Sequence, residues 1–183
     1  CWTSIVRSVW ATMQRTPRTK LEATSWFAVV RAYQECNRRY AQLLKRFDLT
    51  IPQFDVLNAV RQLGAQATPR AIADELVVTR GNITGVLHRL QERSLMVTRH
   101  HAHDGRSFVC TLTSTGIALL QEARLAAATF VKCQLAPFAD RELQETETQM
   151  KRMRQHLRTI DPDEIVGEIS KRKRAAGKEA AER

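Results

Sequence analysis

The sequence predicts a mainly α-helical fold that contains one small β-hairpin. Three observations support this prediction. Apolar residues recur at steps of three and four over most of the chain, threonines stand where several helices should begin, and one pair of alternating segments brackets an Asp-Gly dipeptide. Steps of three and four place side chains on one face of a helix, whereas alternation by two is typical of a strand.

A long first helix is expected over residues 19–48. Its apolar stripe advances in heptad-like steps and consists of Trp26, Val29, Tyr33, Cys36, Tyr40, Leu43 and Phe47. A small core does not require a helix of this length, so the stripe indicates packing against a second subunit. Residues 1–18 are expected to be flexible. Residues 1–12 are interpreted as non-native sequence or as the product of an upstream start.

Residues 49–113 are expected to form three short helices followed by the hairpin. Thr50, Thr68 and Thr79 each precede an apolar-periodic stretch and are expected to cap a helix, and Gly64 is expected to end the first of the three. Residues 95–101 and 107–112 are β-like. Residues 102–106 between them contain Asp-Gly, which favours a tight turn.

Two further long helices are expected over residues 114–160, separated at Pro137. Their apolar residues again follow helical spacing, so they are assigned with the first helix to dimerisation. Residues 161–183 are charged and are expected to form a frayed helix or a flexible tail. The basic run at 171–174 either adds nonspecific affinity for DNA or is simply solvated.

The charge balance favours a polyanionic partner. Lys and Arg outnumber Asp and Glu by 29 to 19, which gives a net charge of +10. Such a balance favours nucleic acid or an anionic membrane surface, although a solvated basic face is the plain alternative. No apolar run approaches the roughly 18–20 residues of a membrane span. The N-terminus does not look like a signal peptide, so a cytoplasmic location is expected.

Few residue patterns in the sequence indicate catalysis or metal binding. The four cysteines, Cys1, Cys36, Cys110 and Cys133, lack the spacing of a metal site and are expected to be reduced structural thiols. We find no nucleophile–base pairing, carboxylate pair or metal-ligand spacing. An enzyme is therefore not expected, nor is a metal or cofactor.

The helix expected over residues 79–93 has the character of a DNA recognition helix. Its apolar residues, Ile83, Val86, Leu87 and Leu90, fall in one sector, and small or polar residues occupy the opposite one. Glycine costs about 1 kcal/mol relative to alanine inside a helix. Two glycines here, Gly81 and Gly85, therefore indicate either close approach to DNA or tight packing against a neighbouring helix.

The hairpin would add a basic wing beside this helix. Arg106 follows the expected turn and is placed to enter a minor groove, with Asp104 orienting it. His100 and His101 are adjacent and so point to opposite faces of a strand, which disfavours a metal site. The residues expected to contact DNA, through base edges or phosphates, are Thr68, Arg70, Thr79, Arg80, Gly81, Asn82, Thr84, His88, Arg89, Arg99, His101, His103, Asp104 and Arg106.

These motifs together resemble the MarR family of winged helix-turn-helix transcriptional regulators. The resemblance covers about residues 26–160 and is carried by LTIPQFDVLNAV, by TPRAIADELVVTRGNITGVLHRLQERSLM, and by Asp104-Gly105-Arg106 followed by Leu112-Thr113. It implies a homodimer that binds a palindromic operator, often as a repressor, and is released by a small, frequently aromatic acid. It also implies that residues 79–89 read the DNA and that Asp104 and Arg106 form the wing's acid–arginine pair.

The resemblance implies an effector pocket between the dimerisation helices and the winged domain. The residues expected to line it are Trp26, Arg31, Tyr33, Tyr40 and Phe54, because an arginine with aromatics suits an aromatic carboxylate; ordinary core packing is the alternative. Two other functions stay open. One is a redox-responsive repressor. Trp26 stands where peroxide-sensing members carry their cysteine, which counts against this function and leaves only Cys110 or Cys133 to carry it. The other is a winged-helix dimerisation or interaction module that does not bind DNA.

Overall fold

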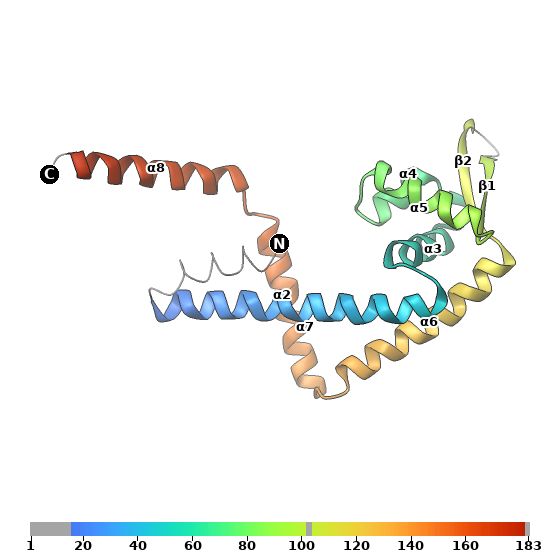
Figure 1. Cartoon of the computed structure of the whole chain (residues 1–183), viewed down its shortest axis with the longest axis horizontal. Coiled ribbons are helices and arrows are strands. Elements are labelled where there is room, and N and C mark those ends of the chain that lie inside the picture. The colour runs from blue at the N-terminus through green and yellow to red at the C-terminus, as the bar shows by residue number, and fades with distance from the viewer. Residues whose placement is uncertain (1–15, 102–103, 182–183) are drawn as a thin grey trace. The chain divides into compact units, whose positions relative to one another are not determined.

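The structure is a computed structural model that describes residues 16–101 and 104–181, with the side chains of all of these except Arg80, 100–107 and 172–181. The chain divides into two compact units, residues 1–133 and 134–183. The first unit contains the expected winged helix-turn-helix (Figure 1). The mainly helical fold with one two-stranded sheet confirms the predicted fold class.

Helix α2 (Pro17–Leu44) is the long first helix, and it continues into a 3-10 turn (Lys45–Phe47). It begins two residues earlier than predicted because Thr16 caps it: the Thr16 hydroxyl accepts the Thr19 N–H at 3.2 Å, and the Thr19 hydroxyl accepts the Thr16 N–H at 3.1 Å. Such a reciprocal pair satisfies two N–H groups that a helix start leaves free. Asp48 ends the segment in the left-handed region, with φ of 55°.

Helices α3 (Ile51–Leu63), α4 (Pro69–Glu75) and α5 (Arg80–Glu92) pack against one another (Figure 1). The Thr50 and Thr68 caps are confirmed, since these hydroxyls accept N–H bonds at 3.4 Å and 3.1 Å. Gly64 ends α3 as predicted. The Thr79 cap is wrong in one respect: Thr79 occupies the capping position of α5, but its hydroxyl accepts no capping bond. The core runs through all three helices and includes Leu57, Ile72 and Leu90.

Strands β1 (Met96–His101) and β2 (Asp104–Leu112) form the expected antiparallel hairpin. The turn is shorter than the predicted 102–106, because His101 of β1 already pairs with Asp104 of β2. The next pair is His100 with Phe108, so a β-bulge on the second strand takes up residues 105–107. The Asp-Gly dipeptide therefore belongs to a bulged strand rather than to the turn, and a bulge strengthens the local twist.

Helix α6 (Ser114–Leu135) starts directly after the hairpin, and the Thr113 hydroxyl caps it by accepting the Gly116 N–H at 3.0 Å. Its first half joins the core through Leu120 and Ala123. The second unit contains α7 (Asp140–Leu157) and α8 (Pro162–Ala181), so the charged segment 161–183 is largely helical. Within the described part of the chain, no helix is long and apolar enough to cross a membrane.

Candidate nucleic-acid interface

Helix α5 separates a buried side from a polar side. Ile83, Leu87 and Leu90 are 3%, 7% and 0% exposed and fix the helix on α3 and α4. The opposite side is exposed and carries the small and polar residues Gly81, Asn82, Thr84, Gly85, His88 and Arg89. The helix therefore presents small and polar groups outward while its packing holds it in place, which is the arrangement that reading base edges in a major groove requires.

The two recognition-helix glycines have open space above them. A Cβ atom built at Gly81 or Gly85 meets no atom within 4 Å. Tight packing against a neighbouring helix, one of the two explanations offered by the sequence, is therefore wrong for this chain. The other explanation, close approach to a partner outside the chain, remains a prediction.

Two predicted contact residues have intramolecular partners that the sequence did not reveal. Arg70 Nε lies 3.8 Å from Asp74 Oδ2, and His88 Nδ1 lies 3.4 Å from Glu92 Oε1, each one helical turn away. All four side chains are well exposed, so these pairs contribute little to stability and can open when a phosphate competes. Thr68 is committed to capping α4 through its hydroxyl.

The hairpin is fastened to the helices at its base. The Cys110 N–H donates to the Ala67 carbonyl at 2.8 Å, which joins β2 to the segment before α4. Gln91 of α5 donates to the Thr98 hydroxyl of β1 at 3.1 Å. Arg99, one residue further along β1, is exposed. These bonds hold the strand that carries Arg99 beside the recognition helix.

The rest of the predicted wing contacts, and one helix contact, fall where side chains are not described. These are Arg80, His101, His103, Asp104 and Arg106. Strand β2 begins at Asp104, so both residues of the expected acid–arginine pair, Asp104 and Arg106, lie on this strand. Its ion pair stays a prediction.

The turn between α4 and α5 has an unusual backbone. Val77 has φ of 54° and its side chain is 89% exposed. A β-branched residue in the left-handed region is a genuine outlier, because its side chain crowds the backbone there. Nothing in the amino-acid sequence around Val77 indicates this strain.

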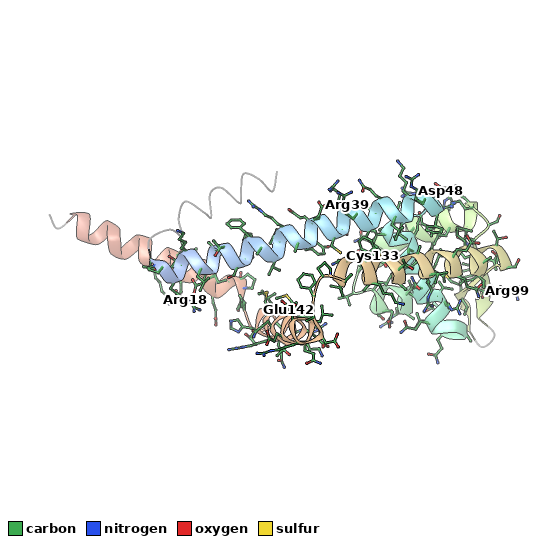
Figure 2. All side chains as sticks on the ribbon, turned by 90° about the horizontal axis from the view of Figure 1, so that it is seen from below. Arg18, Arg39, Asp48, Arg99, Cys133 and Glu142 are labelled. Atoms are coloured by element: carbon green, nitrogen blue, oxygen red, sulfur yellow. The ribbon has the colours of Figure 1, made fainter. Side chains whose placement is uncertain are left out.

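The end of α5 is joined to both long helices of the first unit. Arg93 Nη2 lies 3.2 Å from Asp48 Oδ2, at the end of α2. The Thr113 hydroxyl, at the start of α6, donates to the Ser94 carbonyl at 2.8 Å. Periodicity gives no sign of either contact because the partners are far apart in the sequence. Figure 2 shows Asp48 where α2 meets the winged domain.

The predicted effector residues separate into two groups. The rings of Tyr40 and Phe54 meet edge to face with centroids 6.1 Å apart. Phe130 of α6, which was not among the predicted pocket residues, lies 5.5 Å from Tyr40 between ring centroids. Burial raises the pKa of the Tyr40 phenol, and the nearby Asp55 carboxylate adds to the effect. Burial also raises the pKa of Asp55.

The other predicted effector residues lie nearer the start of α2. Trp26 contacts Phe27 with centroids 5.1 Å apart, and Arg31 and Tyr33 are exposed. Arg31 precedes Tyr40 by nine residues, or roughly 13 Å along a helix at about 1.5 Å per residue. Within one chain, the structure therefore does not bring this arginine to the Tyr40–Phe54 pair.

The described cysteines differ in accessibility. Cys110 is fully buried, and burial raises the pKa of its thiol to about 11. A thiol in that state is a poor nucleophile at neutral pH, which weakens the redox alternative for this residue. Cys36 is half-buried and Cys133 is exposed. Among the described residues, no group of three or more His, Cys, Asp or Glu is arranged to hold a metal ion.

A three-helix unit with an exposed polar recognition helix and a hairpin beside it defines a winged helix-turn-helix protein. Residues 47–107 match the family model described as MarR family. An uncharacterised HTH-type transcriptional regulator of Bacillus anthracis is 34% identical over 98 residues, which are 54% of this chain and 64% of the relative. The chain thus spans under two thirds of that relative's length. The winged helix-turn-helix of this chain is therefore similar to that of MarR-family regulators.

Two characterised proteins are similar over larger shares of their own length. The organic hydroperoxide resistance transcriptional regulator of Bacillus subtilis (strain 168) is 26% identical over 104 residues, covering 57% of this chain and 70% of the relative. The structure of BpsR from Bordetella bronchiseptica, whose DNA binding is regulated by 6-hydroxynicotinic acid, is 27% identical with a TM-score of 0.62. That alignment covers 69% of this chain and 90% of BpsR.

Proposed function

We propose that this protein is a transcriptional regulator that binds a palindromic operator as a homodimer, acts as a repressor and is released by a small aromatic acid. The observation that carries the DNA-binding part is the division of α5, whose apolar side is buried while its polar side from Gly81 to Arg89 is exposed. The family match over residues 47–107 supports the same part of the proposal.

Binding to duplex DNA tests the first part of the proposal. A labelled duplex from upstream of the protein's own gene is titrated and compared with a scrambled duplex of equal composition, at a stated salt concentration because phosphate contacts make affinity salt-dependent. We expect at least about a thousandfold preference for the upstream duplex, which is the lower end of what specific sites show. Equal affinity for the two duplexes refutes specific regulation.

Two variants locate the reading surface. Arg89→Ala removes an exposed cation from α5, and Arg61→Ala removes one from α3 as the matched control. We expect Arg89→Ala to weaken binding about tenfold, equivalent to about 1.4 kcal/mol, and Arg61→Ala to change affinity less than about threefold. Equal effects of the two variants would mean that net charge, and not the α5 surface, controls affinity.

The homodimer is proposed from apolar side chains that one chain leaves uncovered. On α2, Trp26 and Tyr33 are 40% and 69% exposed, and on α7 Met150, Met153 and Leu157 are also exposed. We expect Tyr33→Glu to raise the dimer dissociation constant at least about tenfold, as loss of an interface aromatic does. The control is Ala32→Glu, which adds the same charge one residue off the stripe. Sedimentation showing a wild-type monomer, or equal effects of both variants, refutes this interface.

The aromatic-acid effector is proposed from Arg31 and the exposed aromatic residues Trp26 and Tyr33 of the same helix, and BpsR offers a ligand of that class. 6-Hydroxynicotinic acid and benzoate are titrated into the protein–duplex complex, with the uncharged benzamide as a comparison. We expect the acids alone to release the duplex, and Arg31→Gln to raise the required concentration about tenfold. Arg18→Gln, on the same helix, serves as the control. Equal potency of benzamide would refute an arginine-bound carboxylate.

A further inference from the structure

The C-terminal end of the recognition helix carries a two-pronged contact that the DNA-reading surface does not use. Arg93, the residue that ends α5, reaches Asp48 across 45 positions of sequence. Its Nη1 donates to the Asp48 carbonyl at 2.5 Å, and its Nη2 lies 3.2 Å from the Asp48 carboxylate. The Arg93 side chain is only 29% exposed, whereas that of Asp48 is 92% exposed. The planar guanidinium thus contacts both the backbone and the side chain of one residue.

Asp48 is held firmly by the end of α2. Its N–H donates to the Lys45 carbonyl at 3.0 Å, and the next N–H, of Leu49, donates to the Leu44 carbonyl at 3.0 Å. The left-handed backbone of Asp48 is one that Asp and Asn adopt more readily than other non-glycine residues. The carbonyl that Arg93 binds is therefore fixed relative to the last turn of α2.

The two residues after Arg93 are joined to the start of α6. The Thr113 hydroxyl donates to the Ser94 carbonyl at 2.8 Å, and the Thr113 N–H donates to the Leu95 carbonyl at 3.1 Å. A Cβ atom on Gly116 of α6 would lie 1.9 Å from the Leu95 carbonyl oxygen, so α6 crosses this point at very close range. Residues 93–95 therefore join α5 to α2 on one side and to α6 on the other.

We infer that Arg93 is a positioning residue for DNA recognition, which holds α5 at a fixed angle to α2 through Asp48. This inference rests on the proposed function. In a two-fold dimer both recognition helices must meet the groove about one turn of DNA apart, roughly 34–36 Å. An altered angle misplaces both. The buried side of α5 still anchors the helix without Arg93, so losing the contact changes the angle and leaves the fold in place.

The contact should influence specific binding more than stability. Exposed ion pairs contribute little to folding, and the Asp48 carboxylate is exposed. We expect Arg93→Met to lower affinity for the upstream duplex roughly tenfold, the equivalent of one well-made base contact. Affinity for the scrambled duplex should fall no further than in Arg46→Met, a control that removes an exposed cation close to Asp48.

Asp48→Asn distinguishes a positioning role from a purely electrostatic one, because the two predict opposite changes in affinity for the upstream duplex. Removing a negative charge near DNA should tighten binding if charge alone matters. If Arg93 positions α5, the variant instead weakens binding to the upstream duplex about threefold, since the carbonyl contact survives and only the carboxylate contact is weakened. Arg93→Lys, which keeps the charge but not the planar fork, should recover less than about half of the lost binding free energy.

Anisotropy titrations of the full chain on both duplexes, at several salt concentrations and with thermal unfolding of each variant, test the inference. If Arg93 acts by positioning, the salt dependence of Arg93→Met equals that of Arg46→Met. A salt dependence shallower by about one phosphate contact in Arg93→Met means that Arg93 binds DNA directly, and this result overturns the inference. Tighter operator binding by Asp48→Asn also overturns it. If the wild type does not distinguish the two duplexes, the proposed function fails first, and that result is visible before any variant is compared.

Discussion

Replacing Gly85 by alanine should make the protein more stable and a poorer DNA binder. Gly85 lies inside α5 on its exposed side, and an added Cβ meets no atom within 4 Å. Alanine is favoured over glycine in a helix interior by about 1 kcal/mol, because the unfolded glycine has more conformations to lose. No steric cost opposes that gain here. For a chain of this size it corresponds to a rise in Tm of about 2–4 °C.

The methyl group that Gly85→Ala adds should weaken DNA binding. Gly85 stands between the predicted contact residues on the outward side of α5, so the added carbon projects toward the groove. If the glycine is there to let backbone and DNA approach closely, the helix must move outward by part of a carbon's diameter. We expect roughly a tenfold loss of affinity for the upstream duplex, about 1.4 kcal/mol.

Urea unfolding and anisotropy titration measure the two effects, and the unfolding is compared at one chain concentration because dimerisation couples stability to concentration. Gly167→Ala is the matched control, since Gly167 lies inside α8 and an added Cβ there also meets nothing within 4 Å. The control should keep wild-type DNA affinity. A Gly85→Ala protein that is more stable yet binds DNA as tightly as the wild type would show that close approach does not explain the glycine.

Three further changes test other parts of the structure. Val77→Gly should stabilise the fold by about 0.5–1 kcal/mol, because it relieves a left-handed cost of roughly 1–2 kcal/mol and loses about 0.5–1 kcal/mol to glycine entropy; a less stable variant in urea unfolding would contradict this. Gly116→Ala should lose about 3 kcal/mol, since its Cβ would lie 1.9 Å from the Leu95 carbonyl oxygen; wild-type stability would show that this crossing adjusts freely. Under a thiol reagent at pH 8, Cys133 should be modified in the folded protein and Cys110, with its pKa of about 11, only after unfolding. Peptide mass analysis of the labelled protein distinguishes these two thiols.

Helix starts were the most predictable features because their signals are local. Thr50 and Thr68 each need only the N–H three residues ahead, and both find it. Thr79 shows the limit of such a local signal. The residue stands at the start of α5 as the sequence indicates, but its hydroxyl makes no capping bond. Sequence thus locates a cap position without fixing the rotamer of the side chain that occupies it.

The hairpin shows a second limit. Alternation identified both strands, but it could not place the turn, because register depends on which residues pair across the sheet. The bulge after Asp104 shifts pairing so that the Asp-Gly signal falls within β2. Contacts such as that of Arg93 with Asp48 are harder still to predict: they join residues of ordinary helical and loop character that only the tertiary fold brings together.

The apolar stripe of α2 combines two different roles that periodicity alone cannot separate. Its C-terminal part, including Tyr40, and the 3-10 turn with Phe47 pack against the core of the winged domain. Its N-terminal part leaves Trp26 and Tyr33 exposed. One continuous helix therefore packs at one end against the domain that carries α5, and near its other end exposes Trp26 and Tyr33, which we propose face a partner subunit. If the proposed dimer forms at the exposed end, we expect changes there to influence the recognition helix through Asp48, which Arg93 contacts at the other end of the same helix.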